Sequence, residues 1–551
     1  MSTITATRPP SAAATSTGGR LTGAWRLTRF ALRRDRIRLS AWVLGIGATL
    51  VLTAQSFPSL YPDAAARQQR AEVMASPAAV AIGGPGIGAA DYTFGAMLTN
   101  EMLALTAAFV ALMAIFTVTR HTRADEEAGR TELVLANPVG RDAPLAAAVT
   151  VAVLASLAVG IVAAVGLGSL GLASIDWPGS FLYGGALASL GIAFTGVAAV
   201  TAQLSDDGRS ASGLAGLVLG LAYAVRAVGD VTGTDAVSWL SPFAWAQRTY
   251  AFVDDRWWPL GLSVLLLVAL VGAAVFLSSR RDLGSGMRQP RPGPVHGSRI
   301  LGTPIGLALR LQRTALIAWT ASLLCFGLMY GTLLGEAREF ASKLEVVDKV
   351  LADYGQAMIP AFLSLLVTML AMTASVFAII ATLRAQAEER SSRAEALLAT
   401  PVSRARWIGS HATVGGAGSV VILLAGSLGV GITAAASLGD GTVLGDVLRG
   451  AAVQMAPLLL VVGFVVALYG WVPRLTALAW VVVVYAMVAG TLGGLLGLPE
   501  WALKLSPFAL VPVLPAQEFT PWPVLGMLAA AAVLYVVGVA GLRRRDLGAS
   551  T

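Results

Sequence analysis

The residues best placed to bind or catalyse lie in two short charged loops with the same pattern, at 123–141 and 387–404. Each pattern predicts a short helix, over 123–137 and 386–400, with a charged face, an apolar ridge and a proline at its end. The charged candidates are Asp125, Glu126, Glu127, Arg130 and Glu132 in the first loop and Glu388, Glu389, Arg393 and Glu395 in the second. Charged loops are commonly only solvated surfaces, but the repeated apolar ridge favours docking in a groove on a soluble partner.

The sequence gives little support to metal binding or to nucleotide binding. One cysteine, Cys325, and three histidines are a poor set for a structural zinc site. The nucleotide-binding pattern G-x-x-x-x-G-K-[ST] does not occur, and none of the three lysines follows a glycine. We therefore expect no metal, no cofactor and no ATP site in this chain.

Ionisable side chains within long apolar runs are costly to place and so point to function. Glu101 and Arg226 are the candidates for a substrate pathway or gate. Both lie near the outer ends of their runs, where snorkelling is cheap, so a structural role is as good an explanation. His411 is better explained as a satisfied polar residue than as a proton relay.

The chain that must position these residues is too apolar for water. Of its 551 residues, 56% are hydrophobic and 13% charged, against about 25% charged in a soluble protein. Because about 20 apolar residues in a helix cross a bilayer, we predict an all-α polytopic membrane protein with twelve spans. They lie at 39–57, 98–119, 145–170, 181–202, 212–228, 259–278, 316–334, 359–382, 408–436, 451–469, 475–495 and 524–542.

The positive charge is distributed unequally between the two sides of the membrane. Of the 39 lysines and arginines, 29 fall on the side that holds both ends of the chain and the central linker, and 9 on the other. The positive-inside rule places the first side in the cytoplasm. The net charge of +8 is then explained by topology and lipid contact, and nucleic acid is not expected as a partner.

The sequence also contains an internal repeat, shown by four collinear matches. They pair 31–42 with 308–319, the motif E-x-x-L-A-x-P-V-x-R at 132–141 and 395–404, Leu-Ser-Pro-Phe-Ala at 240–244 and 505–509, and Arg-Arg-Asp-Leu-Gly at 280–284 and 544–548. The offsets are 277, 263, 265 and 264. Since each copy has six spans, the two copies are parallel and should be related by a pseudo-two-fold axis along the membrane normal.

A basic helix is predicted before the first span. Arg26, Arg29, Arg33 and Arg36 share one helical face within 21–38. This pattern favours an amphipathic elbow helix in the membrane interface, although a plain juxtamembrane basic segment is possible. Its counterpart, 305–313, is shorter, and the tryptophan-rich segments 229–256 and 499–521 are expected to be interfacial or re-entrant at the outer side.

These elements give a plan for the whole chain. Residues 1–20 are a disordered tail, 21–286 the first unit, 287–304 a cytoplasmic linker and 305–551 the second unit. The chain resembles the ABC-2 (type V) exporter permeases. The paired loops, the Leu-Ser-Pro-Phe-Ala motifs and the Arg-Arg-Asp-Leu-Gly ends are similar to the fused, two-repeat actinobacterial polyketide-antibiotic exporters of the tetronasin-resistance type.

This resemblance implies a function and a partner. The chain would be the permease of an efflux pump in the plasma membrane, exporting hydrophobic or amphipathic compounds by alternating access. A separate ATPase, a homodimer in that family, would carry ATP and magnesium and would dock at the coupling helices, Asp125 to Glu132 and Glu388 to Glu395. Three alternatives remain: a proton-coupled antiporter of twelve spans, an ABC permease for a lipid or polymer, and a membrane scaffold that transports nothing.

Overall fold

A computed structural model describes residues 19–281, 298–342, 345–391, 393–492 and 499–545. Helices make up most of these residues, and no strand occurs among them. The chain divides into two units, Met1–Pro292 and Gly293–Thr551. The division falls within the linker predicted at 287–304, and each unit is described below by itself.

Twelve helical stretches are long and apolar enough to cross a membrane, which confirms the predicted spans. In the first unit they are Arg36–Leu60, Phe94–Glu127, Ala143–Gly168, Trp177–Leu204, Gly208–Val231 and Leu260–Ser279. In the second unit they are Pro304–Thr332, Ile359–Arg390, Arg404–Leu438, Thr442–Trp471, Pro473–Gly490 and Pro521–Arg544. The chain is therefore a multi-pass membrane protein.

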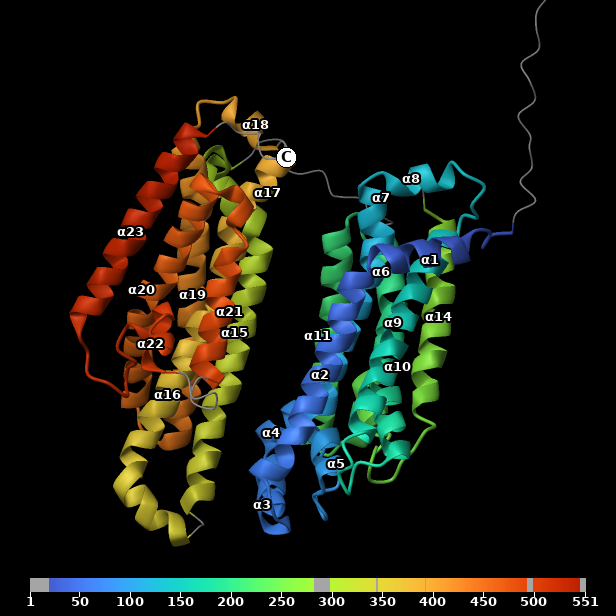
Figure 1. Cartoon of the computed structure of the whole chain (residues 1–551), viewed down its shortest axis with the longest axis horizontal. Coiled ribbons are helices and arrows are strands. Elements are labelled where there is room, and N and C mark those ends of the chain that lie inside the picture. Colours follow the sequence, from blue (N-terminus) through green and yellow to red (C-terminus); the bar gives the residue numbers. More distant parts are fainter. Residues whose placement is uncertain (1–18, 282–297, 343–344, 392, 493–498, 546–551) are drawn as a thin grey trace, which may run out of the picture. The chain divides into compact units, whose positions relative to one another are not determined.

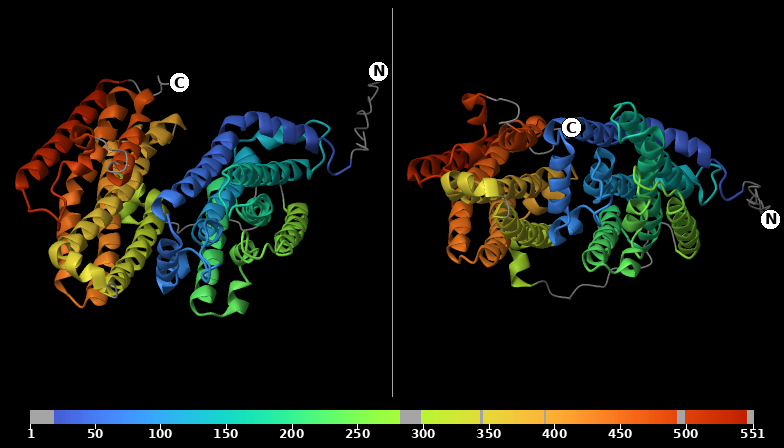
Figure 2. Two further views of the ribbon diagram at one scale, coloured as in Figure 1. Left: turned by 60° about the horizontal axis from the view of Figure 1, so that its bottom comes forward. Right: turned by 90° about the horizontal axis from the view of Figure 1, so that it is seen from below.

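The first unit is a bundle arranged around its fourth span, α10 (Trp177–Leu204), which packs against four other long helices and is the most buried of the twelve spans. Figures 1 and 2 show the bundle from three sides. Its other long helices are α1 (Ala24–Arg34), α2 (Arg36–Leu60), α6 (Leu103–Thr119), α9 (Ala143–Gly168), α11 (Gly208–Val231) and α14 (Leu260–Ser279). The short helices α7 (Asp125–Glu127) and α8 (Arg130–Leu135) lie at one end with α1, and α3 (Ala64–Met74), α4 (Pro77–Ile82) and α5 (Phe94–Met97) lie at the other (Figure 1).

Glycine permits the closest helix contact in this bundle. Gly160 of α9 and Gly184 of α10 face each other, and a Cβ on either would lie within 2.5 Å of the other's carbonyl oxygen. The spacing of Gly160, Ala164 and Gly168 predicts such helix packing.

The second unit has the same order of spans, and most of its long helices are longer than their counterparts in the first unit. Its long helices are α15 (Pro304–Ser342), α16 (Glu345–Thr382), α19 (Arg404–Leu438), α20 (Thr442–Trp471), α21 (Leu478–Leu492) and α23 (Pro521–Arg544). The short helices α17 (Arg384–Arg390) and α18 (Arg393–Leu398) lie at one end of the unit (Figure 1). They correspond to α7 and α8.

The structure corrects three expectations about short elements. The helix predicted over 305–313 is not separate, because α15 runs unbroken from Pro304 into the seventh span, whereas α1 and α2 are separated at Asp35. The helices predicted over 123–137 and 386–400 are each two short pieces. In the first loop the break is Gly129, whose φ of 70° is natural only for glycine.

The tryptophan-rich segments 229–256 and 499–521 contain only short helices. In the first unit they hold α12 (Asp235–Ser238) and α13 (Pro242–Gln247), and in the second α22 (Glu500–Leu503) and the 3-10 turn Pro507–Ala509. Phe243 and Phe508, from the paired Leu-Ser-Pro-Phe-Ala motifs, are both buried. The phenylalanine of the motif therefore anchors the segment within its own unit in both copies.

Candidate functional site

In each unit, the two short helices between the second and third span form what we call the coupling segment: α7 and α8 in the first unit, α17 and α18 in the second. The end of the unit that holds this segment is its charged end. Nine predicted candidate residues lie in the two coupling segments, and the structure separates them into residues that bind within their own unit and residues that face outwards.

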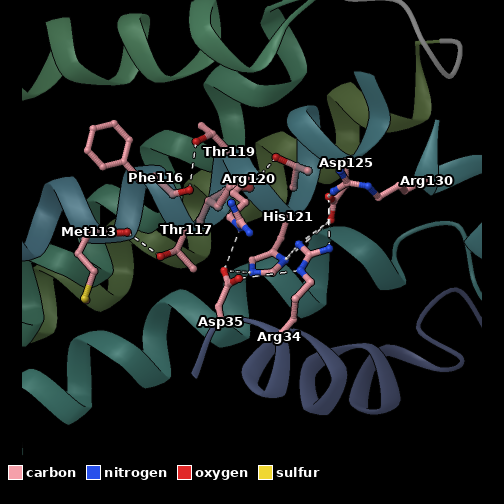
Figure 3. A network of polar contacts seen from close by, with 12 residues as sticks. Arg34, Asp35, Met113, Phe116, Thr117, Thr119, Arg120, His121, Asp125 and Arg130 are labelled. Carbon is pink, nitrogen blue, oxygen red and sulfur yellow. Dashed lines mark hydrogen bonds and ion pairs between the residues drawn. The ribbon is translucent and has the colours of Figure 1, made fainter. Parts of the chain in front are cut away.

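The first coupling segment is tied to the elbow helix α1 through Asp125 (Figure 3). An Arg34 nitrogen lies 2.9 Å from Oδ2 of Asp125, and Arg130 lies 2.6 Å from Oδ1. A ring nitrogen of His121 contacts Arg34 at 2.8 Å, and the other contacts Asp35 at 3.0 Å. We call this set of contacts the brace of the first unit.

Asp35 is buried at the junction of α1 and α2, where it also lies 3.2 Å from Arg120. Arg120 and His121 belong to a short π-helical turn, Arg120–Ala124, which continues the second span. Such a turn re-aims side chains at the end of a helix. The brace therefore connects the elbow, the second span and the coupling segment.

Glu126 forms a second tie, this time to the sixth span. Its two carboxylate oxygens accept hydrogen bonds of 2.8 and 3.0 Å from Arg281, immediately after α14. Arg281 also donates to Gln203 at the end of α10, at 2.7 Å, and Arg123 lies 3.2 Å from Glu126. The side chains of Glu126 and Arg281 are 9% and 10% exposed, so this is a largely desolvated, two-pronged ion pair.

The second unit repeats this ion pair with equivalent residues. Arg545, after α23, donates to Glu389 of α17 at 2.7 Å, and Tyr469 at the end of α20 donates to the same carboxylate at 2.5 Å. Glu389 aligns with Glu126, and Arg545 aligns with Arg281 in the Arg-Arg-Asp-Leu-Gly motif. We call the Glu126–Arg281 and Glu389–Arg545 pairs the clasps.

A third repeated contact closes the same junction. Arg141, the last residue of the first E-x-x-L-A-x-P-V-x-R motif, donates to the carbonyl oxygens of Ser278 and Arg281 at 2.7 and 3.0 Å. In the second unit, Arg404 donates to the carbonyl oxygens of Leu542 and Arg545. These carbonyls are acceptors that the end of a helix leaves without a partner in the helix. Two repeated motifs thus contact each other in both units.

The contacts equivalent to the brace are made by different residues in the second unit. Glu388, which aligns with Asp125, lies 3.2 Å from His411 and 3.3 Å from the indole nitrogen of Trp407. The other ring nitrogen of His411 lies 3.4 Å from Gln312, which aligns with Asp35. His411 is therefore a satisfied polar residue, as the sequence favours, and it belongs to the third span of its unit rather than the second.

The remaining candidates of the coupling segments face outwards. They are Glu127, Arg130 and Glu132 in the first unit and Arg393 and Glu395 in the second, and Arg390 is exposed beside them. Arg130 is exposed although its guanidinium also binds Asp125 in the brace. Leu133 is 73% exposed, and its counterpart is Ala396. These exposed residues, called the outward faces below, are the surfaces available to a partner.

The elbow helix presents a second surface. Arg26, Arg29 and Arg33 of α1 are exposed, and so are Trp25 and Phe30. The single helix predicted over 21–38 is wrong, because the helix breaks at Asp35 and Arg36 is exposed at the start of α2 instead. Thr28 and Ala31, on the opposite side of α1, are buried, because α1 packs against α9.

The two candidates for a pathway or gate are bound within the opposite end of the first unit. Glu101 accepts two hydrogen bonds from Arg70, at 2.7 and 3.1 Å, and one from Tyr92. The bond to Glu101 raises the pKa of Arg70. Arg226 is fully buried and donates to the carbonyl oxygens of Val80 and Ile82.

The sequence as a whole matches known transport proteins. The model of a family described as multidrug efflux system permease Rv1217c, C-terminal domain, matches residues 27–277 and 301–543. The multidrug efflux system permease protein Rv1217c of Mycobacterium tuberculosis (strain ATCC 25618 / H37Rv) is 39% identical over 549 residues, which cover 98% of each chain. The chain belongs to this family of multidrug efflux permeases. It is thus a membrane transport protein, as the resemblance to exporter permeases implies.

The first unit contains a small cavity and the second unit a larger groove. A cavity of about 50 Å³ lies beside the first clasp, lined by His121, Glu126, Gln203 and Arg281 among others. It has room only for water-sized molecules. A groove of about 410 Å³ lies between α19, α20 and α23 of the second unit and is lined mostly by Gly, Ala, Val and Leu side chains.

Sequence reasoning missed several residues of this site. Arg141, Arg281, Arg404 and Arg545 were visible as parts of repeated motifs, and the repetition was the signal that could have marked them. Asp35 and His121 gave no such signal, since Gln312 and Arg384 occupy their aligned positions.

Proposed function

We propose that this chain is the membrane-spanning subunit of an ATP-driven ABC-type efflux pump, energised by a separate ATPase that docks on the two outward faces. The observation that carries the proposal is the duplicated coupling segment: in both units a short charged helix pair is fixed to its own bundle and presents an exposed Arg and Glu, Arg130 with Glu132 and Arg393 with Glu395. The family of multidrug efflux permeases supports export as the activity.

The sequence favours ATP hydrolysis by a partner protein as the energy source for transport. A P-loop does not occur in the chain, so hydrolysis requires a second protein. Every carboxylate within the twelve spans lies within about two helical turns of a span end, whereas a proton-coupled antiporter needs one that is accessible inside the membrane. ATP and magnesium would bind the partner, which is a homodimer in the exporters that this chain resembles.

The orientation in the membrane is inferred from the distribution of positive residues, and the substrate class from the side chains that line the groove of the second unit. The 29 positive residues on one side against 9 on the other place the charged ends in the cytoplasm, where ATP is available. The groove of the second unit is within the size range of small-molecule sites and is apolar. Hydrophobic or amphipathic compounds, of the polyketide-antibiotic type, are therefore the proposed substrates.

The elbow helix is proposed to contact lipid. Its exposed surface holds Arg26, Arg29 and Arg33 together with Trp25 and Phe30, and the exposed Arg36 follows at the start of α2. Exposed arginines beside exposed aromatic rings are the arrangement of a helix that lies in a bilayer interface and binds anionic headgroups.

The proposal is tested with the purified permease and the ATPase that co-purifies with it. Charge reversal on both outward faces (Glu132→Arg, and Arg393→Glu with Glu395→Arg) keeps the Arg130–Asp125 contact and should weaken ATPase binding at least tenfold, or about 1.4 kcal/mol. The matched control reverses Arg209 and Arg474, which are exposed at the start of the fifth span of each unit and should leave binding unchanged.

Three outcomes would contradict the proposal. They are transport of a dye by the permease alone on a pH gradient, ATPase binding unaffected by reversal of both outward faces, and stimulation of hydrolysis by a lipid or polymer precursor but by no antibiotic.

A further inference from the structure

The two clasps occupy a position that the proposed function does not explain. A docking surface needs exposed residues, but Glu126 and Glu389 point into their own units and are 9% and 6% exposed. Each binds the arginine that follows the sixth span of its unit. The clasps therefore join the coupling segment to a helix that is remote from it in sequence, by 155 and 156 residues.

The clasp is the charged tie that both units keep. Glutamate and arginine occupy aligned positions in the two units, and the backbone carbonyls beside each arginine bind the aligned residues Arg141 and Arg404. The brace, in contrast, changes from Asp35 to Gln312 and uses histidines from different spans. The residues of the clasp are the same in both units, whereas those of the adjacent brace differ. We infer that the clasp residues are under a functional constraint that the brace residues are not.

The fourth span joins the same junction in both units. Gln203 binds Arg281 at the end of α10, and Tyr469 binds Glu389 at the end of α20. The ends of the second, fourth and sixth spans thus meet at one buried ion pair in each unit. A displacement of the coupling segment cannot leave the sixth span in place without separating two desolvated charges, which is strongly unfavourable.

We propose that Glu126 with Arg281, and Glu389 with Arg545, are positioning residues that transmit movement of the coupling segments to the sixth span of each unit. Each clasp stays closed through the transport cycle, so the coupling segment and the end of the sixth span move as one body. This inference rests on the proposed function, because the movement it transmits is that of an attached ATPase.

The test uses the permease in complex with its ATPase in proteoliposomes. Replacing both arginines (Arg281→Gln with Arg545→Gln) should reduce drug transport at least tenfold. Binding of the ATPase and its basal hydrolysis should change less than twofold, because the outward faces are intact. A loss of folding would reduce all three quantities together.

The neighbouring arginines provide a matched control. Arg280 and Arg544, the first arginines of the same two motifs, are exposed and lie outside the clasps. Replacing both by glutamine removes the same charge from the same helix ends and should leave transport within twofold of the wild type.

A rescue distinguishes transmission from simple stability. In a Cys325→Ser background, Glu126→Cys with Arg281→Cys removes the first clasp, and Glu389→Cys with Arg545→Cys removes the second. A short bifunctional methanethiosulfonate reagent should then restore transport to this variant, because it restores the connection without the charges. Failure of the linked protein to transport, or full transport by the unlinked variant, would overturn the inference.

The wild-type complex distinguishes a failure of the proposed function from a failure of the inference about the clasps. If its ATPase neither binds nor responds to drug, the proposed function is wrong and the inference is overturned with it. If the wild type is coupled and the clasp variants are equally coupled, only the inference is wrong.

Discussion

At the charged end of the first unit, charged side chains join the coupling segment to the elbow helix, whereas the second unit makes the equivalent contact with a neutral glutamine. Asp35 contacts His121, Arg120 and Arg34 in the first unit, and Gln312 contacts His411 in the second. The clasps keep a glutamate and an arginine in both units. The charged contact is therefore retained at the clasp and replaced at the elbow.

The elbows differ in the same way. In the first unit α1 is a separate helix with three exposed arginines, and in the second the corresponding residues are the start of the unbroken helix α15. The loss of Arg34, replaced by Leu311, accompanies this change. A separate elbow thus occurs where a charged brace is present to hold it.

The largest effect that should distinguish the units is on stability. Asp35→Ala leaves Arg120 and His121 without their shared buried carboxylate and should destabilise the protein by about 3 kcal/mol. Gln312→Ala removes a neutral hydrogen bond and should cost about 1 kcal/mol. Thermal unfolding of the purified variants checks this order, and Asp35→Asn should fall between them. Equal losses for Asp35→Ala and Gln312→Ala would show that the two braces are energetically alike.

A smaller effect should separate the elbows by their lipid preference. Replacing Arg26, Arg29, Arg33 and Arg36 by glutamine removes up to about 1 kcal/mol of attraction to anionic lipid per residue. We expect the enrichment of phosphatidylglycerol over phosphatidylcholine around the protein in nanodiscs to fall at least tenfold. The control replaces Arg310 and Arg313 at the start of α15, which are also exposed. A loss as large in the control would contradict a specific role for α1.

The smallest effect concerns the start of the fifth span. Asp207 caps α11 by accepting bonds from the Ser210 backbone and hydroxyl, whereas Val472, before the corresponding turn of the second unit, has no capping side chain. Burial opposes ionisation of Asp207, but these hydrogen bonds outweigh it and lower its pKa. Asp207→Ala should therefore cost about 1 kcal/mol.

The pH dependence of this cap has a definite sign. Because the pKa of Asp207 is lower in the folded state, its contribution is present above the unfolded value of about 3.9 and is lost as the pH falls through the folded value. The difference in melting temperature between wild type and Asp207→Ala should be constant from pH 8 to pH 5 and should shrink near pH 3. A difference that grew on acidification would contradict this assignment.

Much of the fold was predictable because it depends on local composition. A run of apolar residues has to form a helix in lipid whatever its neighbours are, so all twelve spans could be located from the sequence. The break between α1 and α2 and its absence in α15 were less accessible, since residues 31–42 and 308–319 are alike in sequence.

The sequence by itself determined that this is a membrane protein built from two copies of a six-span unit, and which loops carry repeated charge. Only the tertiary structure decided what each charge does. Glu126 and Glu127 are adjacent and chemically identical, yet one is buried against Arg281 and the other is exposed. Helical geometry turns neighbouring side chains in different directions, and the partner that lies in one of those directions comes from the end of a helix 155 residues away.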